Sequence, residues 1–243
     1  MTNHIIAHFA TEGVISEVKP LGEGLINDTF IVRTEGDATP DYVLQRINHH
    51  IFTDVVGLQR NIEIVTGHIR RQLESEGADD IDRRVLHFLP LADDPALTFF
   101  YDKESDSYWR MMVFIPRSRT FSAVTPDSAR DAGRSFGNFQ KRLVSVPETL
   151  VETIPDFHNM ELRLSQFKEA LAADRAGRLS EVKDIADDLL RRGEDMCIAE
   201  RLHREGKLPK RICHCDTKVN NMLFDEEGNV LCVIDLDTVM PSF

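Results

Sequence analysis

Residues 211–224 read RICHCDTKVNNMLF, and residues 230–240 read VLCVIDLDTVM. A polar loop here joins two apolar segments, and the second segment ends in two acids, Asp235 and Asp237. Side chains alternate along a strand, so a strand that continued to this point would project both carboxylates to one side. Two carboxylates held together at the end of an apolar strand need a compensating cation or hydrogen bonds. Mg²⁺ meets this need, because it binds one or two carboxylates together with phosphate oxygens.

The spacing His214-x-Asp216-x4-Asn221 matches that of a kinase catalytic loop. In such a loop the Asp accepts the proton of the attacking hydroxyl, the Asn gives an oxygen to a metal, and a later Asp joins the metal to the phosphates. We therefore predict Asp216 as the catalytic base, in contact with the substrate, and Asn221 and Asp235 as metal ligands. Lys218 is predicted to add a cation near the transferred phosphoryl group. We expect His214 to hold the loop by hydrogen bonds.

Other interpretations of these residues stay open. A polar loop that merely caps a strand would also explain His214 and Asp216. Asp237 is predicted to contact the substrate. The alternative is that Asp237 only supports its neighbour Asp235. A zinc site at Cys213, His214 and Cys215 is disfavoured, because consecutive residues of a strand-like segment point to opposite sides and no second ligand pair follows in the sequence.

A glycine-containing stretch lies far upstream, where residues 20–30 read PLGEGLINDTF between two predicted strands. Gly22 and Gly24 allow the backbone to approach a triphosphate closely, although a plain hairpin turn is an equal alternative. No Gly-Lys-Ser/Thr follows, which excludes a P-loop. We predict nucleotide contacts from Gly22, Gly24, Asn27 and Thr29.

Hydrophobic periodicity predicts an α+β protein of two parts. The first part, residues 1–115, alternates like a sheet and contains two helices. The second part, residues 116–243, is mainly helical and begins with a helix capped at Thr125 and Pro126. The predicted strands are 14–19, 29–34, 42–47, 85–89, 97–101, 108–115, 211–213, 222–224 and 230–235, and the other predicted helices are 4–11, 53–76, 160–174 and 179–205.

Composition narrows the classes of partner. The chain has 243 residues and a formal charge of −12, which disfavours nucleic acid and anionic lipid as partners. No segment approaches the roughly 18 apolar residues of a membrane span, and the first residues lack a secretory leader. Three of the four cysteines lie between residues 213 and 232, which is not a disulfide framework. We expect a reduced, cytoplasmic protein that acts on small molecules.

Taken together, these motifs resemble those of the aminoglycoside phosphotransferase/choline kinase superfamily, and within it those of the bacterial N-acetylhexosamine 1-kinases. The most specific segments are DTKVNN at 216–221 and IDLDT at 234–238. The similarity also includes HFATEG at 8–13, LQRIN at 44–48, NIEIVT at 61–66, AGRSFGNFQ at 132–140 and FKEALAAD at 167–174.

The resemblance implies a protein-kinase-like fold of two lobes, with a small antiparallel sheet in the N-terminal nucleotide-binding lobe and a mainly helical C-terminal catalytic lobe. It implies ATP- and Mg²⁺-dependent phosphorylation of the anomeric hydroxyl of N-acetylglucosamine or N-acetylgalactosamine. Adenine is expected to meet the connector at Phe114 and Ile115. The alternatives are a kinase of the same fold for choline, homoserine or an aminoglycoside, and an inactive nucleotide-binding module.

Two departures from the family pattern stand out. Many members carry a lysine in the third strand that holds the α- and β-phosphates, whereas Gln45 has this place here and is predicted to contact the nucleotide by hydrogen bonds. The neighbouring Arg46 is expected on the opposite side, where a surface pair with Glu63 is one possibility. The family also continues beyond Phe243 with several helices, so the resemblance predicts a chain truncated at its C-terminus.

Overall fold

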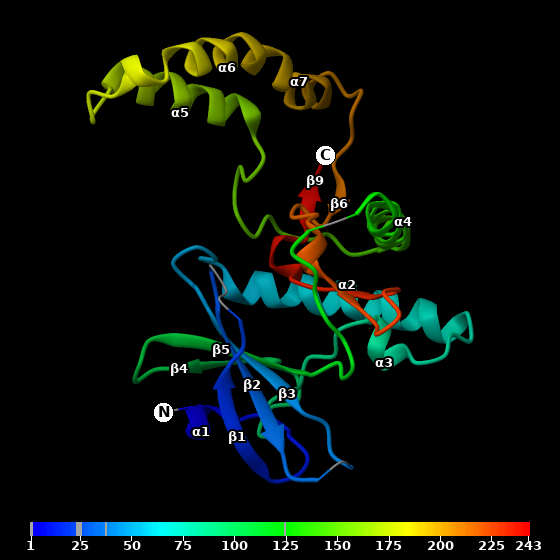
Figure 1. Ribbon diagram of the computed structural model, residues 1–243. Coiled ribbons are helices and arrows are strands. Elements are labelled where there is room, and N and C mark those ends of the chain that lie inside the picture. The colour runs from blue at the N-terminus through cyan, green and yellow to red at the C-terminus, as the bar shows by residue number, and fades with distance from the viewer. Residues whose placement is uncertain (1, 23–25, 37, 124) are drawn as a thin grey trace.

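The computed structural model of the protein describes residues 2–22, 26–36, 38–123 and 125–243. The N-terminal part is a five-stranded antiparallel sheet with the strand order β1-β2-β3-β5-β4 (Figure 1). A mainly helical part follows, so the predicted α+β class is confirmed. The strands of the sheet are β1 Ile15–Pro20, β2 Asp28–Thr34, β3 Tyr42–Ile47, β4 Phe99–Asp102 and β5 Ser107–Val113.

The two faces of the sheet have different roles. Leu44 and Met111 lie opposite each other on β3 and β5, and both pack with helix α1 (Thr2–Ile6) in a buried apolar cluster. Side chains alternate along a strand, so the next pair in register, Gln45 and Arg110, projects to the other face. Polar side chains are thereby directed away from the apolar cluster and toward the rest of the molecule.

Helix α2 (Val55–Ser75) lies between the sheet and helix α4 in Figure 1. Asp54 caps its first turn by accepting a hydrogen bond from the Gly57 amide at 2.8 Å. Its apolar residues recur at intervals of three and four, and those on the inner face, such as Leu58 and Ile62, are fully buried. The long helix predicted for this region is confirmed.

The C-terminal part contains the helices α4 to α7 and two small two-stranded sheets. Helix α4 begins at the Thr125 cap, as predicted, and Figure 1 shows α5, α6 and α7 set apart from the five-stranded sheet. The strands pair as β6 with β9 and β7 with β8. Its elements are α4 Pro126–Leu143, α5 Met160–Ala173, α6 Lys183–Met196, α7 Ile198–Arg204, β6 Arg211–Cys213, β7 Met222–Phe224, β8 Val230–Val233 and β9 Met240–Ser242, with 3₁₀ turns at Leu179–Glu181, Val219–Asn221 and Leu236–Thr238; the short helix α3, Ile81–Arg84, follows α2 in the N-terminal part.

The strand predicted at residues 85–89 is wrong. This segment forms a single bridge, from Phe88 to Met112, although most of its side chains are buried. Strand β4 already occupies that edge of β5 as far as Arg110, so only the last residues of β5 are left to pair with it. The run of apolar residues at 85–89 therefore reflects burial and not strand pairing.

The single helix predicted at residues 179–205 is also wrong. A 3₁₀ turn at Leu179–Glu181 comes first, and Cys197 separates α6 from α7. The backbone of Cys197 has ψ near 8°, and its thiol is hydrogen-bonded to the Gly193 carbonyl at 3.2 Å. The helical spacing of the apolar residues continues through Cys197, so the sequence pattern does not show the interruption of the helix there.

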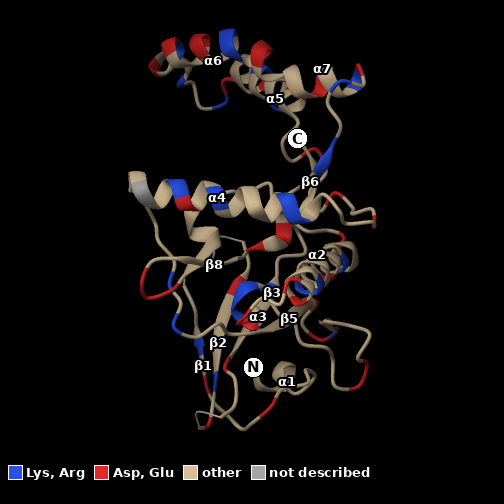
Figure 2. Ribbon diagram, turned by 90° about the vertical axis from the view of Figure 1, so that its right-hand side faces the viewer, with Lys and Arg blue, Asp and Glu red and all other residues tan. Residues whose placement is uncertain are grey.

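Lys or Arg residues and Asp or Glu residues alternate along α6 and also occur on α4 (Figure 2). Several form pairs along α6, such as Lys183 with Asp187 at 2.8 Å. Exposed pairs of this kind contribute little to stability. Among the residues that the structure describes, none of the helices combines the length and the apolar character needed to cross a bilayer.

Candidate active site

His214 lies at the centre of the loop that follows β6 and is fully buried. Its Nε2 is 2.9 Å from the Ile234 carbonyl, and its Nδ1 accepts a hydrogen bond from the Asp216 amide at 3.3 Å. Both contacts fit a neutral ring protonated at Nε2. The edges of Phe136 and Phe139 from α4 pack against the ring. The imidazole thus ties the loop to the segment after β8, which agrees with the holding role predicted for it.

Burial lowers the pKa of His214 below its ordinary value of 6.5. The unfolded chain therefore binds this proton at a pH where the folded chain does not, and the free energy of unfolding is expected to fall as the pH falls below 6.5. Urea unfolding between pH 5 and pH 7.5 measures this dependence. A His214→Gln variant should show a shallower loss, while identical slopes in both proteins would contradict the assignment.

Asp216, Lys218 and Asn221 form the polar cluster that the sequence predicted. Asp216 Oδ2 accepts a hydrogen bond from Asn221 Nδ2 at 2.9 Å and lies 2.8 Å from Lys218 Nζ. Asn221 Nδ2 also donates to the Asp216 carbonyl at 2.9 Å. These two hydrogen bonds from Nδ2 fix the orientation of the Asn221 side chain, and they do not use its Oδ1. The Asp216 side chain is 34% exposed, so a small molecule can reach it.

Asp235 follows the end of β8 but does not belong to the strand. Strand β8 ends at Val233, Asp235 has a left-handed φ of 59°, and Asp237 lies in the 3₁₀ turn Leu236–Thr238. The prediction that a strand projects both acids to one side is therefore wrong. The Ile234 amide donates to the Asn221 carbonyl at 2.9 Å, which brings Asp235 next to Asn221. The two predicted metal ligands are thus neighbours in space.

The electrostatics of Asp235 favour a cation. Desolvation by the surrounding protein, the largest cause, and the charges of Asp237 and Asp216 together raise the pKa of this carboxyl to about 6. Arg110 and Lys218 act in the opposite direction without cancelling the effect. A carboxylate whose ionised form is disfavoured gains from a bound positive charge.

The donor set at this place suits Mg²⁺. It consists of the Asp235 carboxylate and the Asn221 Oδ1, and Mg²⁺ takes such oxygens together with phosphate oxygens and water. Within the described ranges, no group of three or more His, Cys, Asp or Glu side chains has the arrangement of a metal site. The assignment of Asp235 and Asn221 as metal ligands stays a prediction.

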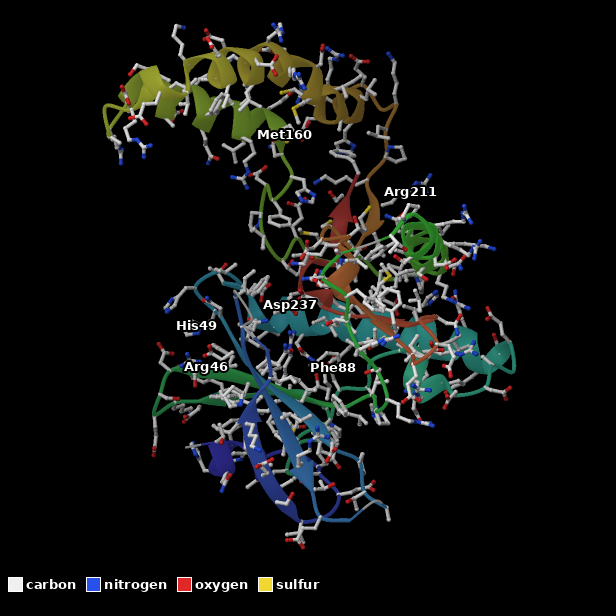
Figure 3. All side chains as sticks on the ribbon, in the orientation of Figure 1. Arg46, His49, Phe88, Met160, Arg211 and Asp237 are labelled. Carbon is white, nitrogen blue, oxygen red and sulfur yellow. The ribbon has the colours of Figure 1, made fainter. Side chains whose placement is uncertain are left out.

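The side chain of Asp237 is buried and is already engaged by other side chains of the protein. Its side chain is 3% exposed, and its Oδ1 lies 2.5 Å from Arg110 Nη1. Its Oδ2 accepts a hydrogen bond from Asn27 Nδ2 at 2.6 Å, and its carbonyl accepts one from the Thr153 hydroxyl at 2.7 Å. Figure 3 shows Asp237 between the sheet and the C-terminal elements. The prediction that Asp237 contacts the substrate has no support in this geometry.

The loop between β1 and β2 is described in part, and Gly24 lies outside the described residues. Gly22 has φ of +72° and open space where a side chain would start, so its backbone is accessible. The side chain of Asn27 is turned inward: it donates to Asp237 and accepts from the Asn48 amide at 3.0 Å. Asn27 therefore holds the end of the loop, and a nucleotide contact from its side chain has no support here.

Gln45 and Thr29 lie side by side on β3 and β2, where Gln45 Nε2 donates to Thr29 Oγ1 at 3.1 Å. Gln45 Oε1 accepts from Arg110 Nε at 2.9 Å. Our sequence interpretation missed Arg110. The signal was present, because Arg110 is the only charge in the apolar stretch YWRMMVFI at residues 108–115. Nucleotide contacts from Gln45 and Thr29 stay predictions.

Arg46 and Glu63 do not pair with each other. Arg46 Nε donates to Asp28 Oδ2 at 2.7 Å on the exposed side of the sheet. Glu63 of α2 instead accepts a hydrogen bond from the Thr98 hydroxyl. The surface pair considered from the sequence is therefore wrong.

The connector at Phe114 and Ile115 leaves the sheet after β5. The Phe114 amide donates to the Asp41 carbonyl at 2.8 Å, and the Ile115 carbonyl accepts from the Ser118 hydroxyl at 2.7 Å. Two backbone groups of the connector are thus already hydrogen-bonded. The contact of adenine with this segment stays a prediction.

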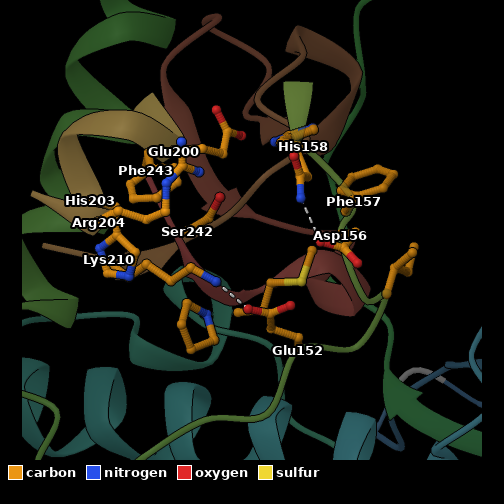
Figure 4. Close-up of a pocket in the computed structure, with 14 residues that line it drawn as sticks. Glu152, Asp156, Phe157, His158, Glu200, His203, Arg204, Lys210, Ser242 and Phe243 are labelled. Carbon is orange, nitrogen blue, oxygen red and sulfur yellow. Dashed lines mark hydrogen bonds and ion pairs between the residues drawn. The ribbon is translucent and has the colours of Figure 1, made fainter. Parts of the chain in front are cut away.

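A pocket of about 200 Å³ lies beside β9, the partner of the strand that leads into the catalytic loop (Figure 4). Its lining comes from residues 152–159, from α7 and from the last residues of the chain. Glu152 and Lys210 form an ion pair across it. No feature of the sequence pointed to this pocket.

Known proteins share this fold. Amicoumacin kinase, solved with AMP-PNP, Ca²⁺ and Ami, is similar with a TM-score of 0.60 at 13% identity, over 99% of this chain and 64% of that one. A microcompartment-associated aminopropanol kinase gives a TM-score of 0.51 at 14% identity, over 98% and 69% of the two chains. A thermostable mutant of aminoglycoside phosphotransferase APH(4)-Ia, solved with AMP-PNP and hygromycin B, gives 0.51 at 14% identity, over 100% and 73%.

This chain therefore spans about 64% of the length of amicoumacin kinase. At these identities the similarity concerns the fold. The match to a protein family is more specific, because the model of the family described as "Phosphotransferase enzyme family" matches residues 17–243. Since that match includes nearly all of the sequence, the chain belongs to the APH phosphotransferase enzyme family.

Proposed function

We propose that this protein transfers the γ-phosphoryl group of ATP to a hydroxyl group of a small molecule. The observation that carries the proposal is the cluster of Asp216, Lys218 and Asn221, with Asp235 held next to Asn221 by the hydrogen bond between the Ile234 amide and the Asn221 carbonyl. Phosphoryl transfer needs a group that accepts the proton of the attacking hydroxyl, oxygen ligands for a metal, and compensation of the phosphate charge. The cluster offers each of these in one place.

Each residue of the cluster has a defined task in this mechanism. Asp216 Oδ2 is held by Asn221 and Lys218, so Oδ1 is the atom that accepts the hydroxyl proton of the acceptor. Lys218 lies beside it and offsets negative charge near the transferred group. Asn221 and Asp235 would hold Mg²⁺, which supplies positive charge to the phosphate oxygens when bound. His214 fixes the loop and takes no part in proton transfer.

For the acceptor we propose N-acetylglucosamine or N-acetylgalactosamine, phosphorylated at the anomeric hydroxyl. This choice is supported by the resemblance of DTKVNN at 216–221 and IDLDT at 234–238 to the N-acetylhexosamine 1-kinases. An amino alcohol or an aminoglycoside is the alternative acceptor. ATP with Mg²⁺ is the proposed phosphoryl donor in either case.

The test is ADP release from Mg·ATP by the purified chain, with and without each amino sugar. We expect release that depends on the sugar and disappears in an Asp216→Asn variant, with ³¹P NMR identifying a 1-phosphate as the product. Release with choline, homoserine or an aminoglycoside instead would keep the phosphotransferase and overturn the sugar assignment. Nucleotide binding without release for any acceptor would contradict the enzymatic proposal.

A further inference from the structure

A closed series of polar contacts joins the sheet to the segment after β8. Asn27 donates to Asp237 at 2.6 Å, Asp237 pairs with Arg110 at 2.5 Å, Arg110 donates to Gln45 at 2.9 Å, and Gln45 donates to Thr29 at 3.1 Å. Asn27 precedes β2 and Thr29 is its second residue, so the backbone between them closes the series into a ring. We call these five residues the polar ring.

The sheet register explains how the polar ring is built. Thr29 lies opposite Gln45, and Gln45 lies opposite Arg110, so the three side chains stand in one row across β2, β3 and β5. Neighbours in such a row project to the same face. Asp237 belongs to the 3₁₀ turn after β8 and pairs with Arg110, the residue at the β5 end of the row.

The ion pair in the polar ring is buried. The side chains of Arg110 and Asp237 are each 3% exposed. Loss of one partner would leave a buried, uncompensated charge, which is strongly unfavourable. The pair therefore holds the segment after β8 against the sheet for as long as both residues are present.

The backbone on either side of Asp237 is fixed as well. Its carbonyl accepts from Thr153, and the Val239 carbonyl accepts from Asn61 Nδ2 of α2 at 3.0 Å. Leu236, between the two acids, is 3% exposed. The position of Asp237 is therefore transmitted to Asp235 through one buried residue.

Protein kinases orient the corresponding region with an ion pair between a lysine in strand β3 and a glutamate in helix αC. Here the β3 residue is the neutral Gln45, and Glu63 of α2 is hydrogen-bonded to Thr98. The positive charge instead comes from Arg110 on β5, and the negative charge comes from the segment that carries Asp235. The kind of interaction is kept, but its partners differ.

We propose that Arg110 and Asp237 are positioning residues that hold Asp235 and the end of the glycine-containing loop in place for a metal-bound nucleotide. This inference rests on the function proposed above. Arg110 acts through Asp237 and Gln45, and neither Arg110 nor Asp237 touches the reacting atoms. The pair joins the two parts of the protein at the level of the nucleotide phosphates, so adenosine binding should not depend on it.

The experiment compares Arg110→Met, Asp237→Asn and the double variant with the unchanged chain. The readouts are the Tm and the affinities for adenosine and for AMP-PNP with MgCl₂, measured by calorimetry. The double variant is decisive, because removal of both charges leaves no unpaired charge in the interior. The matched control is the double change Arg46→Met with Asp28→Asn, which removes an exposed ion pair of the same chemistry from the same sheet.

Each single variant is expected to lower the Tm by about 10 °C, because one buried charge loses its partner. The double variant should regain most of this loss. Its affinity for Mg·AMP-PNP should nevertheless stay about 10- to 100-fold below that of the unchanged chain, as found when residues that orient metal ligands are replaced. Its affinity for adenosine should be unchanged, and the control should match the unchanged chain in all readouts.

A double variant that binds Mg·AMP-PNP as tightly as the unchanged chain would overturn the proposal and leave the pair a structural feature only. An equal loss of adenosine and AMP-PNP affinity would also overturn it, because the effect would then be general. If the unchanged chain binds neither nucleotide, the proposed function itself fails and the inference fails with it. These outcomes separate the two failures.

Discussion

The variant Asp216→Asn is expected to lose phosphoryl transfer by about 100- to 10,000-fold, which is the usual contribution of a general base. Its nucleotide affinity should be unchanged. Asparagine has the size of aspartate but cannot accept the proton of the acceptor hydroxyl. The contacts with Asn221 and Lys218 involve Oδ2, so an asparagine can keep part of this geometry.

The measurement is the steady-state rate of ADP formation at saturating Mg·ATP, together with calorimetry of AMP-PNP binding. The matched control is Asp131→Asn on α4, an exposed aspartate paired with Arg134, which should have the unchanged rate. Full turnover by Asp216→Asn would show that another group accepts the proton. An equal loss of nucleotide affinity would show that Asp216 acts on binding and not on the chemical step.

The variant Asp235→Asn is expected to weaken binding of Mg·AMP-PNP by at least about 10- to 100-fold, because the metal loses its carboxylate ligand. The same change is expected to raise the Tm at pH 7. Desolvation and the charges of Asp237 and Asp216 raise the pKa of Asp235 to about 6, so at pH 7 the folded chain holds an ionised carboxylate that it disfavours. Near pH 5 the aspartate is protonated in the folded chain, and the gain in Tm should be smaller.

Binding is measured with MgCl₂ and with EDTA, and the Tm is measured at both pH values. In EDTA the variant and the unchanged chain should bind AMP-PNP alike. The assignment of Asp235 as a metal ligand would be wrong if the variant kept full Mg²⁺-dependent affinity. A fall in Tm at pH 7 would show that Asp235 stabilises the fold, contrary to the electrostatic argument.

Local sequence was sufficient to predict that Asp216, Lys218 and Asn221 cluster in the proposed catalytic loop. Asp216, Lys218 and Asn221 lie within six consecutive residues, so a loop of ordinary geometry brings them together. Under the proposed function their spacing follows from the reaction, because a base and a metal ligand must meet one phosphoryl group. Helix α2 was equally predictable, since its buried residues follow the helical period.

Strand predictions from the local sequence pattern were wrong at two segments, where the same pattern also fits buried residues outside a strand. The buried residues of 85–89 have the composition of a strand, but β4 occupies most of the edge to which they would pair. Asp235 and Asp237 have the spacing of a strand, but β8 ends at Val233, Asp235 is itself left-handed, and Asp237 lies in a 3₁₀ turn. In both places the decision depends on neighbours that are distant in the sequence.

The sequence by itself determined the α+β class and the cluster of Asp216, Lys218 and Asn221 in the proposed catalytic loop, because these depend on periodicity and on contacts between near neighbours. Only the tertiary structure decided that Asp237 turns inward to Arg110 and that Asn27 joins them. Asn27 and Asp237 are 210 positions apart in the chain, and their contact depends on sheet register and on how the segment after β8 reaches the sheet. A buried charge needs a partner that is close in space, and a single sequence does not show which distant residue will be that partner.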